Sequence, residues 1–120
     1  AAERVKQVVE GVCVANGAGV DFEFKDGYPT TANHPEQTRF ATQIAAEIAG
    51  STDKVDEDIA PTMGGEDFAY YLEEKPGAFM FLGNGDTAGL HHPKYDFNDE
   101  AIPYGCSYFI KLVEAAMPAA

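Results

Sequence analysis

Basic residues are scarce in this 120-residue sequence, because eight lysines and arginines stand against twenty aspartates and glutamates and give a formal net charge of −12. A surface with that balance repels phosphate backbones and anionic lipid headgroups. The sequence also has no apolar run near the roughly 20 residues that a bilayer-spanning helix needs. We therefore expect neither nucleic acid nor a membrane as a partner.

Cysteine is also scarce, since only Cys13 and Cys106 are present, far apart and in apolar helical contexts. This usage favours buried free thiols over a disulfide or a pair of metal ligands, and it predicts a cytoplasmic protein. A thiol nucleophile at Cys13 is disfavoured because no acidic residue is placed to orient a histidine base.

The sequence has no initiator Met, and no capping Ser, Thr, Asp or Asn precedes its first helical pattern. We therefore expect a piece of a longer protein. With 45% hydrophobic residues, the chain is long enough to form one core.

Two segments have the pattern of strands. In "VDFEFKDGY", residues 20–28, apolar and charged side chains alternate, which predicts a strand with one buried face. In "AFMFLG", residues 78–83, nearly every position is apolar, which is typical of a strand covered on both faces. Helical patterns cover residues 1–16 and 35–49, a short segment after Gly64-Gly65, and a segment opened by residues 98–100, whose expected core residues are Phe109, Ile110, Leu112, Val113 and Ala116.

These elements predict an α/β (mixed α+β) architecture in two parts, in which a sheet lies between helices. The crossing between the two parts lies near residues 28–33. Two alternative sites are disfavoured. "LGNGDTAG" does not open a helix as a nucleotide-binding loop must, and "STDKVDEDIAP" lacks the glycine of a calcium-binding EF-hand loop.

The segment "GLHHPKYDF" carries two adjacent histidines just beyond the second predicted strand. Neighbouring residues of an extended chain point to opposite sides, so at most one of His91 and His92 faces a given pocket. Groups that bind ligands in α/β folds lie beyond the carboxyl ends of strands. Zinc takes three or four protein ligands, and no second cluster occurs at ligand spacing. From the residues alone, a metal ligand and a solvated pair both remain open.

Three motifs together resemble a known family. "YPTTANHPEQTRFA", "PTMGGEDFAYYLEEKPGAFMFLGNG" and "LHHPKYDFNDEAIPYG" are similar to the C-terminal third of metal-dependent N-acyl-amino-acid amidohydrolases, typified by hippurate hydrolase and the plant indoleacetyl-amino-acid hydrolases. The resemblance covers essentially the whole chain. It implies a catalytic α/β domain with a divalent metal pair, zinc or manganese, and a smaller α+β satellite domain that mediates dimerisation. Residues 1–28 would be the end of that satellite domain, residues 29–120 the C-terminal part of the catalytic domain, and the protein a homo-oligomer.

By this resemblance, His91 falls on the family's C-terminal metal ligand and His92 on a variable position. Gly64 and Gly65 match a tight turn that lines the pocket for the N-acyl amino acid substrate, and Asn33 matches a position at the domain crossing that contacts substrate. Other interpretations of these three are a helix start that needs glycine and a helix cap.

The family's other metal ligands and its general-base Glu have no counterpart in this sequence. The resemblance therefore implies a chain that is inactive alone and binds no metal stably, although the full-length protein would be an amidohydrolase. The alternative is a non-catalytic small-molecule-binding or protein-interaction module that retains the fold.

Overall fold

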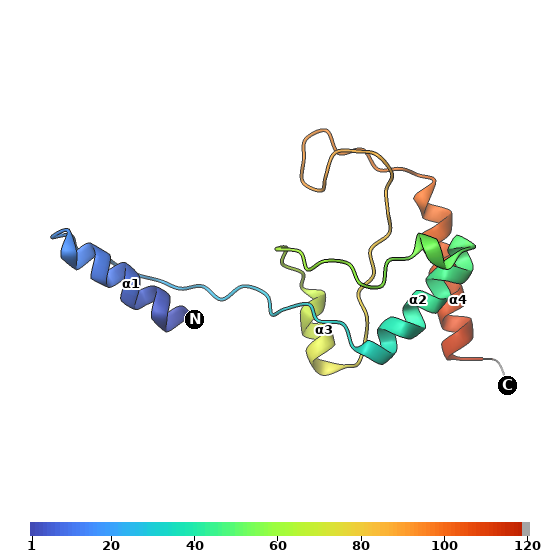
Figure 1. Cartoon of the computed structure of the whole chain (residues 1–120), viewed down its shortest axis with the longest axis horizontal. Coiled ribbons are helices and arrows are strands. Elements are labelled where there is room, and N and C mark those ends of the chain that lie inside the picture. Colours follow the sequence, from blue (N-terminus) through green and yellow to red (C-terminus); the bar gives the residue numbers. More distant parts are fainter. Residues whose placement is uncertain (119–120) are drawn as a thin grey trace.

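A computed structural model describes residues 1–118 of the chain. Figure 1 shows helices joined by long connections. The elements in chain order are α1 (Ala2–Ala15), α2 (Pro35–Ala49), the 3-10 helix η1 (Thr52–Lys54), α3 (Phe68–Glu74) and α4 (Ala101–Ala116). The four predicted α-helices are thereby confirmed.

The boundaries of α2 follow from local chemistry. Pro35 occupies the first turn, where its missing N–H costs nothing and its fixed φ suits the helix. Gly50 ends the helix with a left-handed φ of 76°, a conformation that glycine adopts without strain. The Lys54 ammonium group then donates a hydrogen bond to the Ala49 carbonyl oxygen at 3.1 Å, so η1 caps the end of α2.

The predicted α/β sheet is wrong, because residues 1–118 contain no β-strand. Both segments predicted as strands run without a neighbouring strand, and side chains expected to be buried are exposed in each, including Phe24 and Phe81. A strand exists only when its backbone N–H and C=O groups pair with another strand. Periodicity shows which side chains favour burial, but it does not supply that partner.

The core of the chain is small. Among the described residues, the buried apolar side chains are Ala41, Ile44, Ala69, Leu72 and Ala101. The radius of gyration is 20.6 Å, against about 14 Å for a compact domain of this length. The accessible surface is 9873 Å², against about 6,300 Å² for a compact protein of this mass. The chain therefore leaves several thousand Å² uncovered that a compact fold would bury.

Residues 1–28 extend away from the rest of the molecule (Figure 1). No residue of α1 is buried, and its valines at positions 5, 8, 12 and 14 are exposed. The chain reverses direction after α1 and runs on to Tyr28, which contacts α3 through an edge-to-face pair with Tyr70. The boundary between predicted units at residue 28 stays a prediction, and the last two residues of the predicted unit 29–120 lie outside the described residues.

Helix α4 packs against α2, and Lys111 forms an ion pair with Glu47 of α2 at 3.6 Å. The side of α4 that is turned away from solvent carries Ala101, Gly105, Tyr108 and Leu112, and partial burial raises the pKa of the Tyr108 hydroxyl. The predicted core positions Phe109, Ile110 and Val113 are exposed instead, because α2 covers the neighbouring face.

The expectation of two buried thiols is wrong for Cys106, which is exposed on α4, whereas Cys13 is half-buried on α1; both are free. Within residues 1–118, no helix combines the length and the apolar character that a membrane crossing requires.

Candidate functional site

The crossing segment 28–34 is fastened to the segment that follows α3. The Asn33 side-chain amide donates to the Phe79 carbonyl oxygen at 2.9 Å and accepts from the Phe79 N–H at 2.7 Å. One residue later, the His34 N–H donates to the Gly77 carbonyl oxygen at 3.0 Å, and its ring Nδ1 accepts from the Gly77 N–H at 3.2 Å. The crossing segment thus supplies residues 77–79 with hydrogen bonds that a neighbouring strand would otherwise provide.

This pairing gives Asn33 a structural role. Its amide presents a donor and an acceptor side by side, which matches the N–H and C=O of one extended residue. One amide hydrogen and one lone pair of Asn33 remain beyond the two bonds to Phe79. The prediction that Asn33 contacts substrate therefore concerns only this second hydrogen and lone pair, and it stays a prediction.

The Gly64-Gly65 turn lies beside the same crossing segment. A Cβ atom at Gly65 would stand 3.2 Å from Cδ2 of Tyr28, so the missing side chain lets the tyrosine ring lie against the turn. A Cβ atom at Gly64 would have only the Thr62 hydroxyl nearby, at 3.9 Å. The next residue, Glu66, accepts a hydrogen bond from the Thr31 hydroxyl at its carbonyl oxygen, at 3.4 Å.

Aromatic side chains fill the space between α3 and the segment after it. Phe68 stacks on Tyr71 with ring centroids 5.5 Å apart and lies 5.6 Å from Phe79, which in turn meets Phe81 edge to face at 5.2 Å. These contacts hold residues 79–81 against α3. Asn33, which bonds Phe79, is thereby connected to α3.

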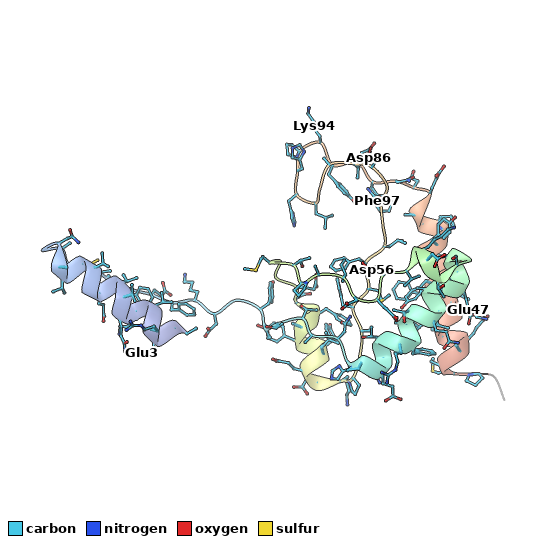
Figure 2. All side chains as sticks on the ribbon, viewed as in Figure 1. Glu3, Glu47, Asp56, Asp86, Lys94 and Phe97 are labelled. Atoms are coloured by element: carbon cyan, nitrogen blue, oxygen red, sulfur yellow. The ribbon has the colours of Figure 1, made fainter. Side chains whose placement is uncertain are left out.

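The second group of candidate residues lies on a long loop, residues 84–98, closed at its base by side chains. Asn84 donates from its amide to the Asp96 carbonyl oxygen at 2.7 Å and accepts from the Asn98 N–H at 2.8 Å. The Thr87 hydroxyl accepts from the Asp96 N–H at 3.1 Å. Figure 2 shows Asp86 and Phe97 near this base, with Lys94 at the outer end of the loop.

His91 lies in the outer part of the loop and is exposed. Its φ is 66°, the one positive φ of a non-glycine residue in the part of the chain that the structure describes. A side chain with a Cβ adopts that conformation at a cost in free energy.

His92 differs from His91. Its N–H donates to the Gly89 carbonyl oxygen at 3.1 Å, and its ring Nδ1 accepts from the Lys94 N–H at 3.1 Å. The His92 imidazole therefore helps to form the turn, whereas no hydrogen bond to the His91 ring is found within residues 1–118.

The residues present do not form a complete metal site. Between residues 1 and 118, no three His, Cys, Asp or Glu side chains converge on one point. An exposed imidazole suits one ligand position of zinc or manganese, but one donor does not hold either ion. The remaining ligands of any metal bound by His91 must come from outside these residues.

The structure thus divides the predicted site residues into two groups. Asn33, Gly64 and Gly65 lie around the crossing segment and α3, and His91 lies on the separate loop of residues 84–98, which Figure 1 shows above the turn that leads into α3. The sequence analysis missed Asn84, which closes that loop. The available signal was its type and place, because asparagine often bonds neighbouring backbone groups in loops.

Comparison with known proteins assigns most of the chain to one family. Residues 3–115 match the family described as "Peptidase family M20/M25/M40". No solved structure matches the chain.

Individual relatives are similar at moderate identity. The Bacillus subtilis protein YhaA is 36% identical over 83% of this chain and 26% of its own length. The N-acetylcysteine deacetylase of Bacillus subtilis is 33% identical, and the hippurate hydrolase of Campylobacter jejuni 31%, each over 92% of this chain and 28% of its own length. The chain therefore spans under a third of the length of these relatives.

Proposed function

Because this chain belongs to the peptidase family M20/M25/M40, we propose that it forms the C-terminal part of the catalytic unit of a metal-dependent amidohydrolase. In this role the chain supplies one metal ligand and part of the substrate pocket. The general-base carboxylate and the other metal ligands come from a part of the protein that these 120 residues do not include. The proposal is consistent with the share of its relatives that the chain spans.

His91 is the proposed ligand, and the observation that supports this proposal is its backbone conformation. Strained residues persist where the surrounding structure holds them, and they concentrate at functional sites. His91 combines a left-handed φ of 66° with an exposed ring, while the neighbouring His92 uses its Nδ1 within the loop. The exposed His91 imidazole is therefore available to a metal ion.

The implied cofactor is a divalent metal pair, zinc or manganese, which would polarise the substrate amide and supply a nucleophile at neutral pH. This chain contributes the His91 imidazole to one of the two ions. A neutral ring nitrogen is the ligand form, and exposure of the ring leaves it free to bind.

The proposed substrates are N-acyl amino acids. Two of the relatives are named a hippurate hydrolase and an N-acetylcysteine deacetylase. In this chain the Gly64-Gly65 turn would seat the substrate, because nothing but the Thr62 hydroxyl approaches the Cβ position of Gly64. Backbone N–H groups at such a turn can approach a carboxylate closely. The second amide hydrogen of Asn33 is available to the same substrate.

The test uses the intact protein that carries this chain. Metal content after dialysis and hydrolysis of N-acyl amino acids are measured for wild type, His91→Ala and the matched control His92→Ala. We expect His91→Ala to lose about one equivalent of metal and at least about a hundredfold in kcat. His92→Ala should keep both ions.

Full metal content in His91→Ala would contradict the ligand assignment. Wild-type protein that binds two ions but cleaves no N-acyl amino acid would contradict the substrate class alone.

A further inference from the structure

The base of the 84–98 loop, which carries His91, is closed by the side chains of Asn84 and Thr87. We infer that Asn84 is a positioning residue for His91: it sets the loop geometry and thereby the affinity of the metal site. The inference rests on the proposed function, since it takes His91 as a ligand. It concerns a residue that neither touches a metal nor follows from the sequence motifs.

The hydrogen bonds of Asn84 join the two ends of the loop. Its amide meets Asp96 and Asn98 at 2.7 and 2.8 Å, twelve and fourteen residues further along the chain. The Thr87–Asp96 bond forms a second connection just inside the first. Compact loops with adjoining ends are held by such internal contacts and are frequently functional. Residues 84–98 contain no helix or strand, so the loop depends on these side-chain bonds at its base.

Both ends of the loop are also fixed to α4. The Asn98 side chain accepts a hydrogen bond from the Glu100 N–H at 3.0 Å, and the Asn98 carbonyl oxygen accepts from the Ala101 N–H at 2.9 Å. Before the loop, Leu82 lies against Gly105 of α4, 3.5 Å from where a Cβ atom would stand. Asn84 thus connects the first residues of the loop to the end at Asn98, which α4 already holds.

The chemistry at this position requires a short amide. Asn84 offers a donor to one carbonyl and an acceptor to one N–H from a single planar group. Alanine removes both bonds, and glutamine keeps the same group on a side chain that is one methylene longer. With both bonds removed, the base opens and His91 samples more positions, so metal binding must order it again.

The expected effect is comparable to the loss of an outer-shell partner of a metal ligand, which lowers metal affinity by roughly 10–100-fold. Asn84→Ala should lie near the lower end, about tenfold, because Thr87 still bonds Asp96.

The experiment measures the affinity of the intact protein for zinc by competition with a chelator, and the amide hydrogen exchange of residues 96 and 98 without metal. Variants are Asn84→Ala, Asn84→Gln, His91→Ala and the control Asp86→Ser, which changes another residue at the base of the same loop. We expect about tenfold weaker binding at one site and faster exchange at residue 98 in Asn84→Ala, partial rescue in Asn84→Gln, and wild-type values in Asp86→Ser.

Outcomes separate the two hypotheses. If His91→Ala weakens zinc binding and Asn84→Ala does not, the positioning role is overturned and the ligand assignment stands. If His91→Ala leaves zinc binding unchanged, the proposed function fails first. Faster exchange in Asn84→Ala with unchanged affinity would show a purely structural role for Asn84 and would overturn the inference.

Discussion

Two extended stretches of this chain, both with the sequence pattern of a strand, differ in how many contacts hold them in place. The first, residues 20–28, connects α1 to the rest of the molecule, and most of its side chains are exposed. The second, residues 78–83, is bonded to Asn33 at Phe79, packed on α3 through Phe68, and in contact with α4 through Leu82. Neither has a strand beside it.

The difference shows that non-local partners, and not the apolar pattern, decide which extended segment becomes fixed. The second segment is held in place by side chains from two helices and from the crossing segment. The first meets residues beyond position 28 at its end, where Tyr28 contacts Gly65 and Tyr70. The stability of the chain should therefore reside in residues 29–118, the second region, and not in residues 1–28, the first region. The two regions should respond unequally to mutation.

The largest expected effect comes from truncating the core beneath the second segment. Leu72 is 6% exposed and lies against Gly77, where that segment begins. Leu72→Ala should lower the free energy of unfolding by about 2–3 kcal/mol, the low end for core leucines because this core is thin. Urea unfolding followed by circular dichroism measures it.

The matched control is Val8→Ala in α1, where Val8 is 50% exposed. A change within about 0.5 kcal/mol is expected there. Equal losses in the two variants would remove the contrast between the two regions.

A medium effect is expected at the hydrogen bonds that replace a neighbouring strand. Asn33→Ala removes both bonds to Phe79 and should cost about 1–2 kcal/mol. Asn16→Ala removes the bond from that side chain to the Val12 carbonyl oxygen, at 2.8 Å, in the first region. It should leave the main unfolding transition unchanged, and a larger loss for Asn16→Ala than for Asn33→Ala in the same unfolding experiment would reverse the comparison.

The helices, the expected strands and the loop differ in how far their structure follows from local sequence. The helices were predictable because Pro35, Gly50 and the apolar spacing of α2 act within a few residues. The strands were not, because strand pairing depends on partners distant in the sequence. The prediction of His91 came from a motif, whereas the hydrogen bonds of Asn84 join residues twelve and fourteen positions apart, a pairing that its residue type alone does not specify.

A smaller effect is expected at the joint between the two regions. In Gly65→Ala the new Cβ would meet the Tyr28 ring at 3.2 Å, and the half-exposed ring can shift to relieve the contact. The cost should stay below about 1 kcal/mol, less than the usual penalty for overpacking. The nuclear magnetic resonance signals of Tyr28 and Tyr70 should move in Gly65→Ala. The same signals should not move in Gly64→Ala. Identical spectra for the two variants would contradict the Tyr28 contact.

The smallest effect sets the lower limit for the comparison. The Lys111–Glu47 ion pair between α4 and α2 is nearly half exposed on both sides. Lys111→Gln should cost about 0.2–1 kcal/mol, and the difference from wild type should shrink when the salt concentration is raised, because solvent and ions screen such pairs. A salt-independent loss above that range would mean that the lysine acts through packing.

The central claim is that the second region presents His91, and not His92, to a metal. The most direct measurement replaces the bound metal of the intact protein with paramagnetic cobalt and records the histidine ring protons by nuclear magnetic resonance. We predict strongly shifted histidine ring signals, of which one histidine's set is lost in His91→Ala while the full set persists in His92→Ala. A full wild-type set of shifted signals in His91→Ala would contradict the claim.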